Sequence, residues 1–420
     1  MDHFQPREGE LWCEDVPLRV IAEAVGTPVY VYSTATLERH LDVFSAALPA
    51  GALVAYAVKA NGSLAVLRTL ARRGAGADTV SEGEIRRALA AGVPPERIIF
   101  SGVGKTDAEL AFAVTAGVGE INVESEPELD RLHTVAARLG ARPKIVFRVN
   151  PSVGAGGHAK INTGSPDSKF GVSLSEAERL YAKAAALPHV EPLGVGCHIG
   201  SQIADLAPLE AAALAVRDLL LRLRAQGFSA SVLDLGGGLG VPYFDAPEPP
   251  SPAEFGAMVR RVVDDLDVRL AFEPGRVIAA NAGVLLTRVI HVHERPEGRR
   301  FLVLDAGMND LLRPAMYDAF HALEPVRAPG AGAELAPYDI VGPVCETGDT
   351  FARDRLLPPL AAGDLAVFRT AGAYGAAMSG EYNSRLLAPE VIVRGDRWAV
   401  TRPRPSYEEM LAREHVPEWA

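Results

Sequence analysis

Short apolar runs alternate with amphipathic segments along the first two thirds of the chain. The runs are too short for helices, and their β-branched and aromatic residues suit a sheet. Predicted strands are Leu53–Val58, Ala75–Val80, Arg97–Ser101, Glu120–Val123, Lys144–Val149, Leu193–His198, Ser231–Leu235 and Arg269–Phe272. Helical segments separate them, such as Leu64–Arg73, Glu82–Ala91 and Glu126–Leu139. Eight such strand–helix units predict an α/β fold, a closed parallel (β/α)8 barrel of the TIM type.

The pattern changes at both ends of this region. Before it, Gly26–Tyr32 is a predicted strand and Thr34–Ala47 a predicted helix. After about Gly283, the apolar runs are bounded by Gly, Pro and Asp and show few helical spacings, which is typical of a mostly antiparallel β domain. These later runs are Val284–Val292, Arg300–Leu304, Asp339–Gly342, Asp364–Arg369 and Glu390–Arg394, followed by a short predicted helix at Tyr407–Glu414.

Composition narrows the class of protein. Of the 420 residues, 48% are hydrophobic and 23% charged, as in an ordinary globular protein. The net charge of −11 and the lack of a basic run argue against a nucleic-acid partner. We expect no membrane span and no signal peptide. The three cysteines, Cys13, Cys197 and Cys345, are too few and scattered for a disulfide framework or a metal site, so we expect a cytoplasmic protein without a metal.

In a parallel barrel, chemistry belongs to the loops that follow the strands. Lys59 follows the first predicted strand, and after Ala60 comes the turn dipeptide Asn61-Gly62. An amine at the mouth of a buried strand loses water, which disfavours its charged form and makes it a nucleophile near neutral pH. The alternative is a lysine that simply extends its ammonium into solvent.

A glycine loop, Gly236–Gly240, follows the seventh predicted strand. Its backbone N–H groups could approach a phosphate without interference from Cβ atoms, and barrels often bind phosphate after their last two strands. A tight structural turn is the alternative. On its position, we favour phosphate binding.

Two further strand ends carry candidate groups. Glu273 and Arg276 follow the eighth strand and could form a salt bridge with each other. Alternatively, Glu273 could keep the ring nitrogen of pyridoxal phosphate protonated. His198 ends the sixth strand and is either a core histidine or a planar group that stacks on a cofactor ring, with Ser201 reaching the phosphate. A lysine, an acid and a phosphate loop together are what a Schiff-base cofactor requires.

With these residues in place, the sequence resembles the diaminopimelate decarboxylases, of the barrel-type (fold type III) pyridoxal-phosphate decarboxylases that also include ornithine and arginine decarboxylases. The resemblance covers nearly the whole chain. The motifs that carry it are Tyr56–Asn61, Asp78–Glu84, Ser168–Gly171, Cys197–Gln202, Gly236–Gly240, Glu273–Arg276, Arg313–His321, Gly342–Asp349 and Gly372–Gly375.

The resemblance implies a role for each candidate residue. Lys59 would carry pyridoxal 5'-phosphate, His198 would stack on its ring, Glu273 would pair with its nitrogen and Cys345 would return a proton after carbon dioxide leaves. Other cofactor contacts would be Asp78, Ser201, Gly237, Gly238, Gly240, Gly275, Arg276 and Tyr374, and substrate contacts would be Arg276, Arg313, Tyr317, Glu346 and Tyr374.

The resemblance also implies an assembly. Family members are usually homodimers with a shared active site, in which the Cys345-Glu346 stretch reaches the partner's site. The implied domains are N-terminal strands in residues 1–35 that join the β domain, the cofactor-binding barrel in 36–283 and the C-terminal β domain in 284–420.

The expected reaction is the decarboxylation of meso-2,6-diaminopimelate to L-lysine and carbon dioxide, the last step of lysine biosynthesis. Arg276 and Arg313 can bind a distal carboxylate and Glu346 a distal ammonium. Alternatives are decarboxylation of ornithine, arginine or carboxynorspermidine, a racemase, or an inactive binding protein on the same scaffold. The glycine-rich segment Asn150–Phe170 is a hypothetical mobile cover over the site.

Overall fold

The computed structural model describes residues 2–154, 163–164, 168–243, 248–330 and 332–420. The chain divides into two compact units. The barrel unit comprises Leu37–Pro242 and Pro247–Ile278, and the β unit comprises Met1–Thr36, Ala279–Ala420 and, from a barrel loop, Tyr243. Gly156, Gly157 and His158, in the segment predicted to cover the site, lie outside the described residues.

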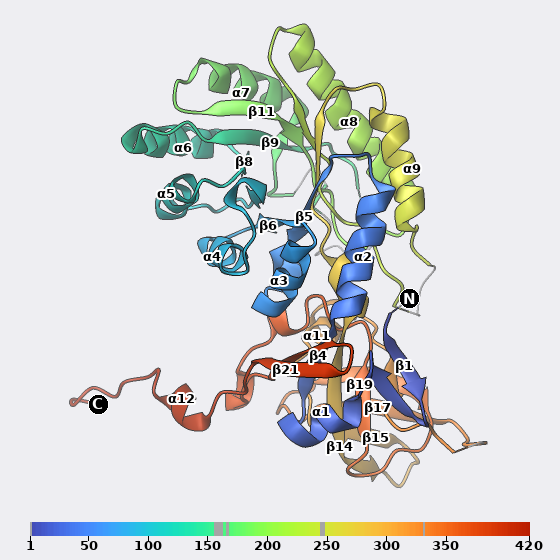
Figure 1. The fold of residues 1–420 in the computed structure, drawn as a ribbon. Coiled ribbons are helices and arrows are strands. Elements are labelled where there is room, and N and C mark those ends of the chain that lie inside the picture. The colour runs from blue at the N-terminus through green and yellow to red at the C-terminus, as the bar shows by residue number, and fades with distance from the viewer. Residues whose placement is uncertain (1, 155–162, 165–167, 244–247, 331) are drawn as a thin grey trace. The chain divides into compact units, whose positions relative to one another are not determined.

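Eight parallel strands form the barrel unit (Figure 1). They pair in chain order, and the circle closes where the last strand pairs with the first. The fold predicted from the sequence is therefore confirmed. The strands are β5 (Leu53–Ala57), β6 (Gly76–Thr79), β7 (Ile98–Phe100), β8 (Glu120–Val123), β9 (Lys144–Asn150), β11 (Glu191–Gly196), β12 (Val232–Asp234) and β13 (Arg269–Phe272), and the short β10 (Val172–Ser173) extends the sheet beside β9.

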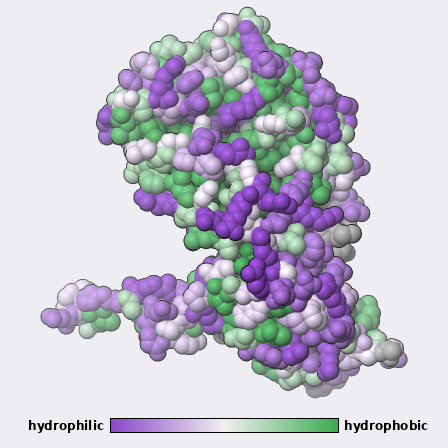
Figure 2. All heavy atoms as spheres, viewed as in Figure 1, coloured by the Kyte–Doolittle hydropathy of each residue, from purple (hydrophilic) through white to green (hydrophobic). Residues whose placement is uncertain are grey.

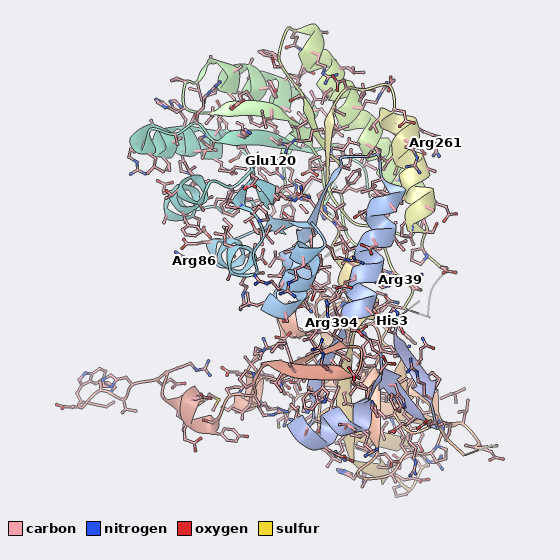
Figure 3. The ribbon with its side chains drawn as sticks, viewed as in Figure 1. His3, Arg39, Arg86, Glu120, Arg261 and Arg394 are labelled. Carbon is pink, nitrogen blue, oxygen red and sulfur yellow. The ribbon has the colours of Figure 1, made fainter. Side chains whose placement is uncertain are left out.

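Helices cover the outside of these strands (Figure 1). Ser or Thr side chains cap several of them by accepting the backbone N–H three residues on, as Ser81, Thr106 and Ser125 do. Arg86 and Arg261 lie on outer helix faces (Figure 3), and hydrophilic residues cover much of the surface seen in Figure 2. The helices are α2 (Thr34–Ala47), α3 (Leu64–Arg72), α4 (Glu82–Ala90), α5 (Asp107–Ala116), α6 (Glu126–Leu139), α7 (Leu174–Ala186), α8 (Leu206–Ala225) and α9 (Pro252–Val263).

The β unit contains a mostly antiparallel sheet, as predicted, with strand order β18-β17-β15-β14-β4-β20-β21. Only β15–β17 and β4–β20 are parallel among its described pairings. Strand β19 pairs with both β14 and β16. The bounds are β4 (Val29–Ser33), β14 (Gly283–Glu294), β15 (Arg300–Leu304), β16 (Leu323–Pro325), β17 (Ala336–Val341), β18 (Thr350–Leu357), β19 (Leu365–Phe368), β20 (Glu390–Arg394) and β21 (Arg397–Arg402). Two short helices of this unit are α11 (Arg313–Tyr317) and α12 (Tyr407–Leu411), whereas all but the last residue of α10 (Arg276–Ala279) belongs to the barrel unit.

The N-terminal segment contributes to this unit in two ways. Strand β4 lies between β14 and β20, and β1 (Phe4–Arg7), β2 (Glu10–Cys13) and β3 (Val16–Pro17) form a separate antiparallel sheet. Phe4 and Leu11 share one hydrophobic core with Val284 and Val391. The same segment contains a helix that was not predicted, α1 (Leu18–Val25), which buries Leu18, Ile21 and Ala22 at helical spacing.

None of the described helices is both long enough and apolar enough to pass through a bilayer.

Candidate active site

Lys59 lies in the single 3₁₀ turn Val58–Ala60 that follows β5. The register of β5 against β6 pairs Ala57 with Asp78, and the Lys59 Nζ donates to Asp78 Oδ2 at 2.8 Å. Asp78 is fully buried, whereas the lysine side chain is 34% exposed. The sequence-based expectation of a dehydrated amine is therefore met only in part, since the amine keeps some contact with solvent and is bound to a carboxylate.

Glu273 follows β13 and is held by groups from other strands. Asn122 Nδ2 and the Ser101 hydroxyl donate to its Oε1 at 3.2 and 3.4 Å. Burial raises the pKa of Glu273 well above its usual value, the negative charges of Asp234 and Asp78 raise it further, and the positive charge of Lys59 opposes them. This carboxyl therefore holds a proton readily.

Sequence reasoning missed Asn122 and Asp234 as site residues. Each is a single polar residue inside an apolar strand, in Ile121-Asn122-Val123 and Leu233-Asp234-Leu235, and both are buried. A lone polar side chain in an otherwise buried strand was the available signal, because such a group needs a partner within the fold.

His198 follows β11, and its ring faces the same region. Its Nδ1 accepts the Gly237 N–H at 3.1 Å and lies 4.0 Å from Glu273 Oε2. Burial lowers the pKa of His198 well below its usual value, and the positive charges of Lys59 and Arg148 lower it further. The imidazole is consequently neutral near pH 7, a state that suits stacking on a flat ring.

The glycine loop after β12 is pressed against its neighbours. Gly236 and Gly238 have φ values of +64° and +111°. A Cβ atom at Gly237 would lie 2.2 Å from the Glu273 carbonyl oxygen, and one at Gly238 would lie 2.6 Å from that of Gly200. Glycine is thus required here for close packing, as the interpretation of the loop as a tight structural turn expects. The same packing brings the loop backbone beside Glu273 and the residues after β11.

A cationic group lies in the same part of the barrel unit. The buried Arg276 opens α10, directly after Gly275, and its guanidinium donates to the Ser201 hydroxyl at 3.0 and 3.3 Å. Gly240, at the end of the glycine loop, donates its N–H to the Ile203 carbonyl at 3.0 Å. A guanidinium and a hydroxyl are donors that match phosphate oxygens.

The other predicted residues belong to the β unit. Arg313, at the start of α11, is buried, with NH1 2.7 Å from His321 Nε2 and its guanidinium carbon 4.6 Å from the centre of the Tyr243 ring. Because a guanidinium only donates, His321 Nε2 is the acceptor, and His321 Nδ1 donates to the Arg369 carbonyl at 2.9 Å. A neutral His321 therefore orients Arg313, while Tyr317 ends the same helix.

Cys345 and Glu346 are exposed on the loop between β17 and β18. The Cys345 N–H donates to Asn383 Oδ1 at 2.8 Å. A hydrogen bond to Glu346 raises the pKa of Tyr382. Neither Asn383 nor Tyr382 was expected from the sequence.

Tyr374 has φ of +56°, a strained value for a side chain of its size. It lies in the Gly372–Gly375 turn, where a Cβ at Gly372 would lie 2.1 Å from the Ala279 carbonyl oxygen. A tight turn thus holds this tyrosine in place.

The barrel unit offers groups that fit pyridoxal phosphate. It combines an amine (Lys59), a neutral imidazole (His198), a buried carboxyl (Glu273) and, near the glycine loop, a guanidinium with a hydroxyl. The buried Asp78 Oδ1 has no hydrogen-bond partner among the described residues, which leaves acceptor capacity there. The described ranges contain no group of three or more His, Cys, Asp or Glu residues placed to hold a metal ion.

Comparisons with known proteins agree with this donor set. Residues 34–280 match the family described as pyridoxal-dependent decarboxylase, pyridoxal binding domain. The diaminopimelate decarboxylase of Zymomonas mobilis is 48% identical and the alignment covers 99% of each chain. A crystal structure of the diaminopimelate decarboxylase of M. jannaschi superposes with a TM-score of 0.94 at 33% identity over 99% of this chain and 98% of that chain. For the Helicobacter pylori enzyme complexed with L-lysine the TM-score is 0.90, at 38% identity over 94% and 98%.

Proposed function

The chain belongs to the diaminopimelate decarboxylases, a branch of the pyridoxal-dependent decarboxylase family, and we propose that it uses pyridoxal 5'-phosphate bound at Lys59. It decarboxylates meso-2,6-diaminopimelate to L-lysine and carbon dioxide; relatives 41–48% identical over nearly the whole chain carry the name diaminopimelate decarboxylase. The observation that carries the cofactor assignment is the gathering of Lys59, His198 and Glu273 in one barrel.

Each barrel residue has a task that its surroundings support. Pyridoxal phosphate, when bound, supplies the electron sink for the reaction. Lys59 holds it covalently, and Asp78 orients the lysine amine. Glu273 holds a proton for the ring nitrogen, and His198 lies against the ring. Phosphate contacts come from Ser201, Gly237, Gly238, Gly240, Gly275 and Arg276, joined by Tyr374 of the β unit.

Substrate recognition falls to residues with matching charge. The distal end of diaminopimelate carries a carboxylate and an ammonium. Arg276 and Arg313 bind the carboxylate, Glu346 binds the ammonium, and Tyr317 and Tyr374 complete the contacts. Ornithine has no distal carboxylate and would leave an arginine charge unpaired, so we place ornithine, arginine and carboxynorspermidine behind diaminopimelate. Cys345 donates its Sγ proton to the carbon that has lost carbon dioxide.

We also propose a cytoplasmic homodimer with a shared site. Cys345 and Glu346 are polar functional groups on an exposed loop, which suits a segment that acts in the partner's site. Acid–base chemistry normally needs exclusion of water, and a second copy would supply that exclusion.

The test is an absorbance spectrum of the purified protein, followed by a carbon dioxide assay on a substrate panel. We expect the visible band of Lys59-bound pyridoxal phosphate and release of carbon dioxide from diaminopimelate well above that from ornithine or arginine. Lys59→Ala should lose the band and lower turnover by at least about a thousandfold. Full turnover in Lys59→Ala would refute the lysine assignment, and ornithine turnover without diaminopimelate turnover would refute the substrate.

A further inference from the structure

A polar cluster lies inside the barrel, where branched aliphatic side chains are usual. It consists of Ser101, Asn122, Asp234 and Glu273, and the two acids are only 2% and 6% exposed. Apolar residues of neighbouring strand positions, such as Ile99 and Ala271, form a small core cluster of the ordinary kind. Burying carboxyl groups is costly, so the fold must tolerate this cluster for a reason other than packing.

A single amide links the two acids. Asn122 Nδ2 lies 3.2 Å from Glu273 Oε1, 3.3 Å from Asp234 Oδ2 and 3.0 Å from the Ser101 hydroxyl. An amide nitrogen has two N–H groups, so it serves two of these acceptors at a time. The other oxygen of Asp234, Oδ1, accepts the Gly236 N–H at 2.8 Å. Both oxygens of Asp234 thus meet donors, an arrangement that favours its ionised form.

The two carboxyls also interact with each other. Burial raises the pKa of both; the interaction between them raises the pKa of Glu273 further and opposes the rise at Asp234, whose two oxygens also meet donors. Two such groups in a dry site cannot both be charged at low cost. The proton therefore resides on Glu273 and the negative charge on Asp234. Other ionisable groups face Glu273 and Asp234 from the surrounding elements. They include both bases and acids: Lys59, Arg148 and His198, and Asp78 and Glu120.

We propose that Asp234 is a positioning residue for the decarboxylation: with Asn122 it fixes Glu273, and its negative charge retains the proton that Glu273 gives to the ring nitrogen of pyridoxal phosphate. The proton leaves a Glu273 carboxyl oxygen and is taken up by the nitrogen lone pair, so no proton from solvent and no further reactant is needed. Glu273 and Asp234 are then both anionic, the positive charge of the protonated ring nitrogen offsets their repulsion, and the added charge of Asp234 makes loss of the ring proton harder. This inference rests on the proposed cofactor.

The experiment compares the loaded wild-type enzyme with Asp234→Asn, which preserves size but removes the charge. Two pH profiles are measured: the absorbance of the bound cofactor and kcat on diaminopimelate. We expect the alkaline midpoint of both to move down by about one unit or more in Asp234→Asn, which is a tenfold loss of the protonated form at a given pH. KM should change by less than about threefold, because the residue does not touch substrate.

Glu120→Gln is the matched control, since Glu120 is another buried acid of the barrel, on β8 (Figure 3). Burial, with the charge of Asp234 adding, raises the pKa of Glu120 to about 8, so Glu120 is ionised at an alkaline midpoint and Glu120→Gln also removes a buried charge, but from a carboxyl that accepts from Arg269. Its cofactor midpoint should match the wild type. Should Asp234→Asn fail to fold, Asn122→Ser removes the link instead and should lower the midpoint by a smaller amount.

Unchanged midpoints in Asp234→Asn, or in Asn122→Ser where that variant is used, would overturn the role of Asp234 while leaving the proposed function intact. Equal shifts in Asp234→Asn and Glu120→Gln would also overturn it, because any buried charge would then do. Failure of the wild type to bind pyridoxal phosphate is a different result and would remove the proposed function itself.

Discussion

The barrel unit and the β unit present the residues proposed for the reaction in opposite ways. In the barrel, Asp78 and Glu273 are buried and hydrogen-bonded to side chains from other barrel elements, Lys59 and Asn122. In the β unit, Cys345 and Glu346 are exposed on a loop, where they contact the consecutive residues Asn383 and Tyr382. The strand ends of a closed barrel hold their side chains in fixed positions. The groups of the exposed loop lack such surroundings, which a second protein surface can supply.

This contrast separates two kinds of task. Buried acids with raised pKa values suit the cofactor, whose charge must be controlled in a dry environment. The exposed thiol of Cys345 suits a proton transfer that takes place after substrate has bound and a second copy of the chain has excluded water. Arg313 lies between these extremes, since it belongs to the β unit but is buried against Tyr243 and His321.

Among the variants that test this contrast, the largest expected effect concerns the exposed loop. Cys345→Ser should lower kcat by about a hundredfold or more, because a hydroxyl is a far weaker acid than a thiol, and should leave the cofactor absorbance unchanged. Mixed with Lys59→Ala under conditions that exchange subunits, it should restore about a quarter of wild-type activity, since half of the dimers would contain one intact shared site.

Each of the two variants measured alone is the control for this mixture. If the mixture is no more active than its components, the thiol and the lysine of a site come from the same chain. The exposed loop would then not need a partner chain to act. An unchanged kcat in Cys345→Ser would remove the loop from the reaction altogether.

Sequence patterns predicted one region of this molecule better than the other. The barrel strands were found because most are short runs rich in apolar residues, and Lys59, His198 and Glu273 were chosen by the rule that strand ends carry chemistry. In the β unit, β18 and β21 were not predicted, because polar residues such as Arg353 and Asp354 interrupt the apolar pattern of an exposed strand.

The partners of the site residues could not be predicted from local pattern. Asn122 contacts Asp234 and Glu273 across the barrel, and these contacts arise from strand closure rather than from spacing along the chain. The stacking of Arg313 on Tyr243 is similar, since 70 positions separate the two residues (313 − 243). Tertiary contacts of this kind become visible only when the fold is known.

The next effect in size concerns the buried arginine of the β unit. Arg313→Gln should raise KM for diaminopimelate by about ten- to a hundredfold, because a carboxylate loses a charge-assisted, paired hydrogen bond. His321→Asn should give a smaller rise, since it disturbs only the orientation of the guanidinium. Steady-state kinetics measure both, with Arg353→Gln, an exposed arginine of β18, as the control. An unchanged KM in Arg313→Gln would show that burial of this arginine serves the fold and not the substrate.

The smallest expected effect concerns the stability cost of the buried acids. Burial raises the pKa of Glu120 from 4.5 to about 8, with Asp234 adding to the rise and Arg269 opposing it. The folded state therefore binds more protons than the unfolded chain between these pH values, so the free energy of unfolding falls as pH rises from about 4.5 to about 8 and is steady above. Glu120→Gln cannot ionise and should lose part of that fall, on the order of 1–2 kcal/mol.

Thermal unfolding of the loaded enzyme at pH 6 and pH 8 measures the difference. The control is Glu126→Gln on α6, whose exposed carboxyl has a pKa lowered to about 2 by hydrogen bonds from Arg179 and Lys183. Glu126 is ionised in both the folded and unfolded chain above pH 6, so its substitution should leave the pH dependence as it is in the wild type. If Glu120→Gln shows the same pH dependence of unfolding as Glu126→Gln, the buried barrel acid titrates as an exposed group does. The contrast between the buried barrel acids and the exposed loop would then make no difference to the free energy of unfolding.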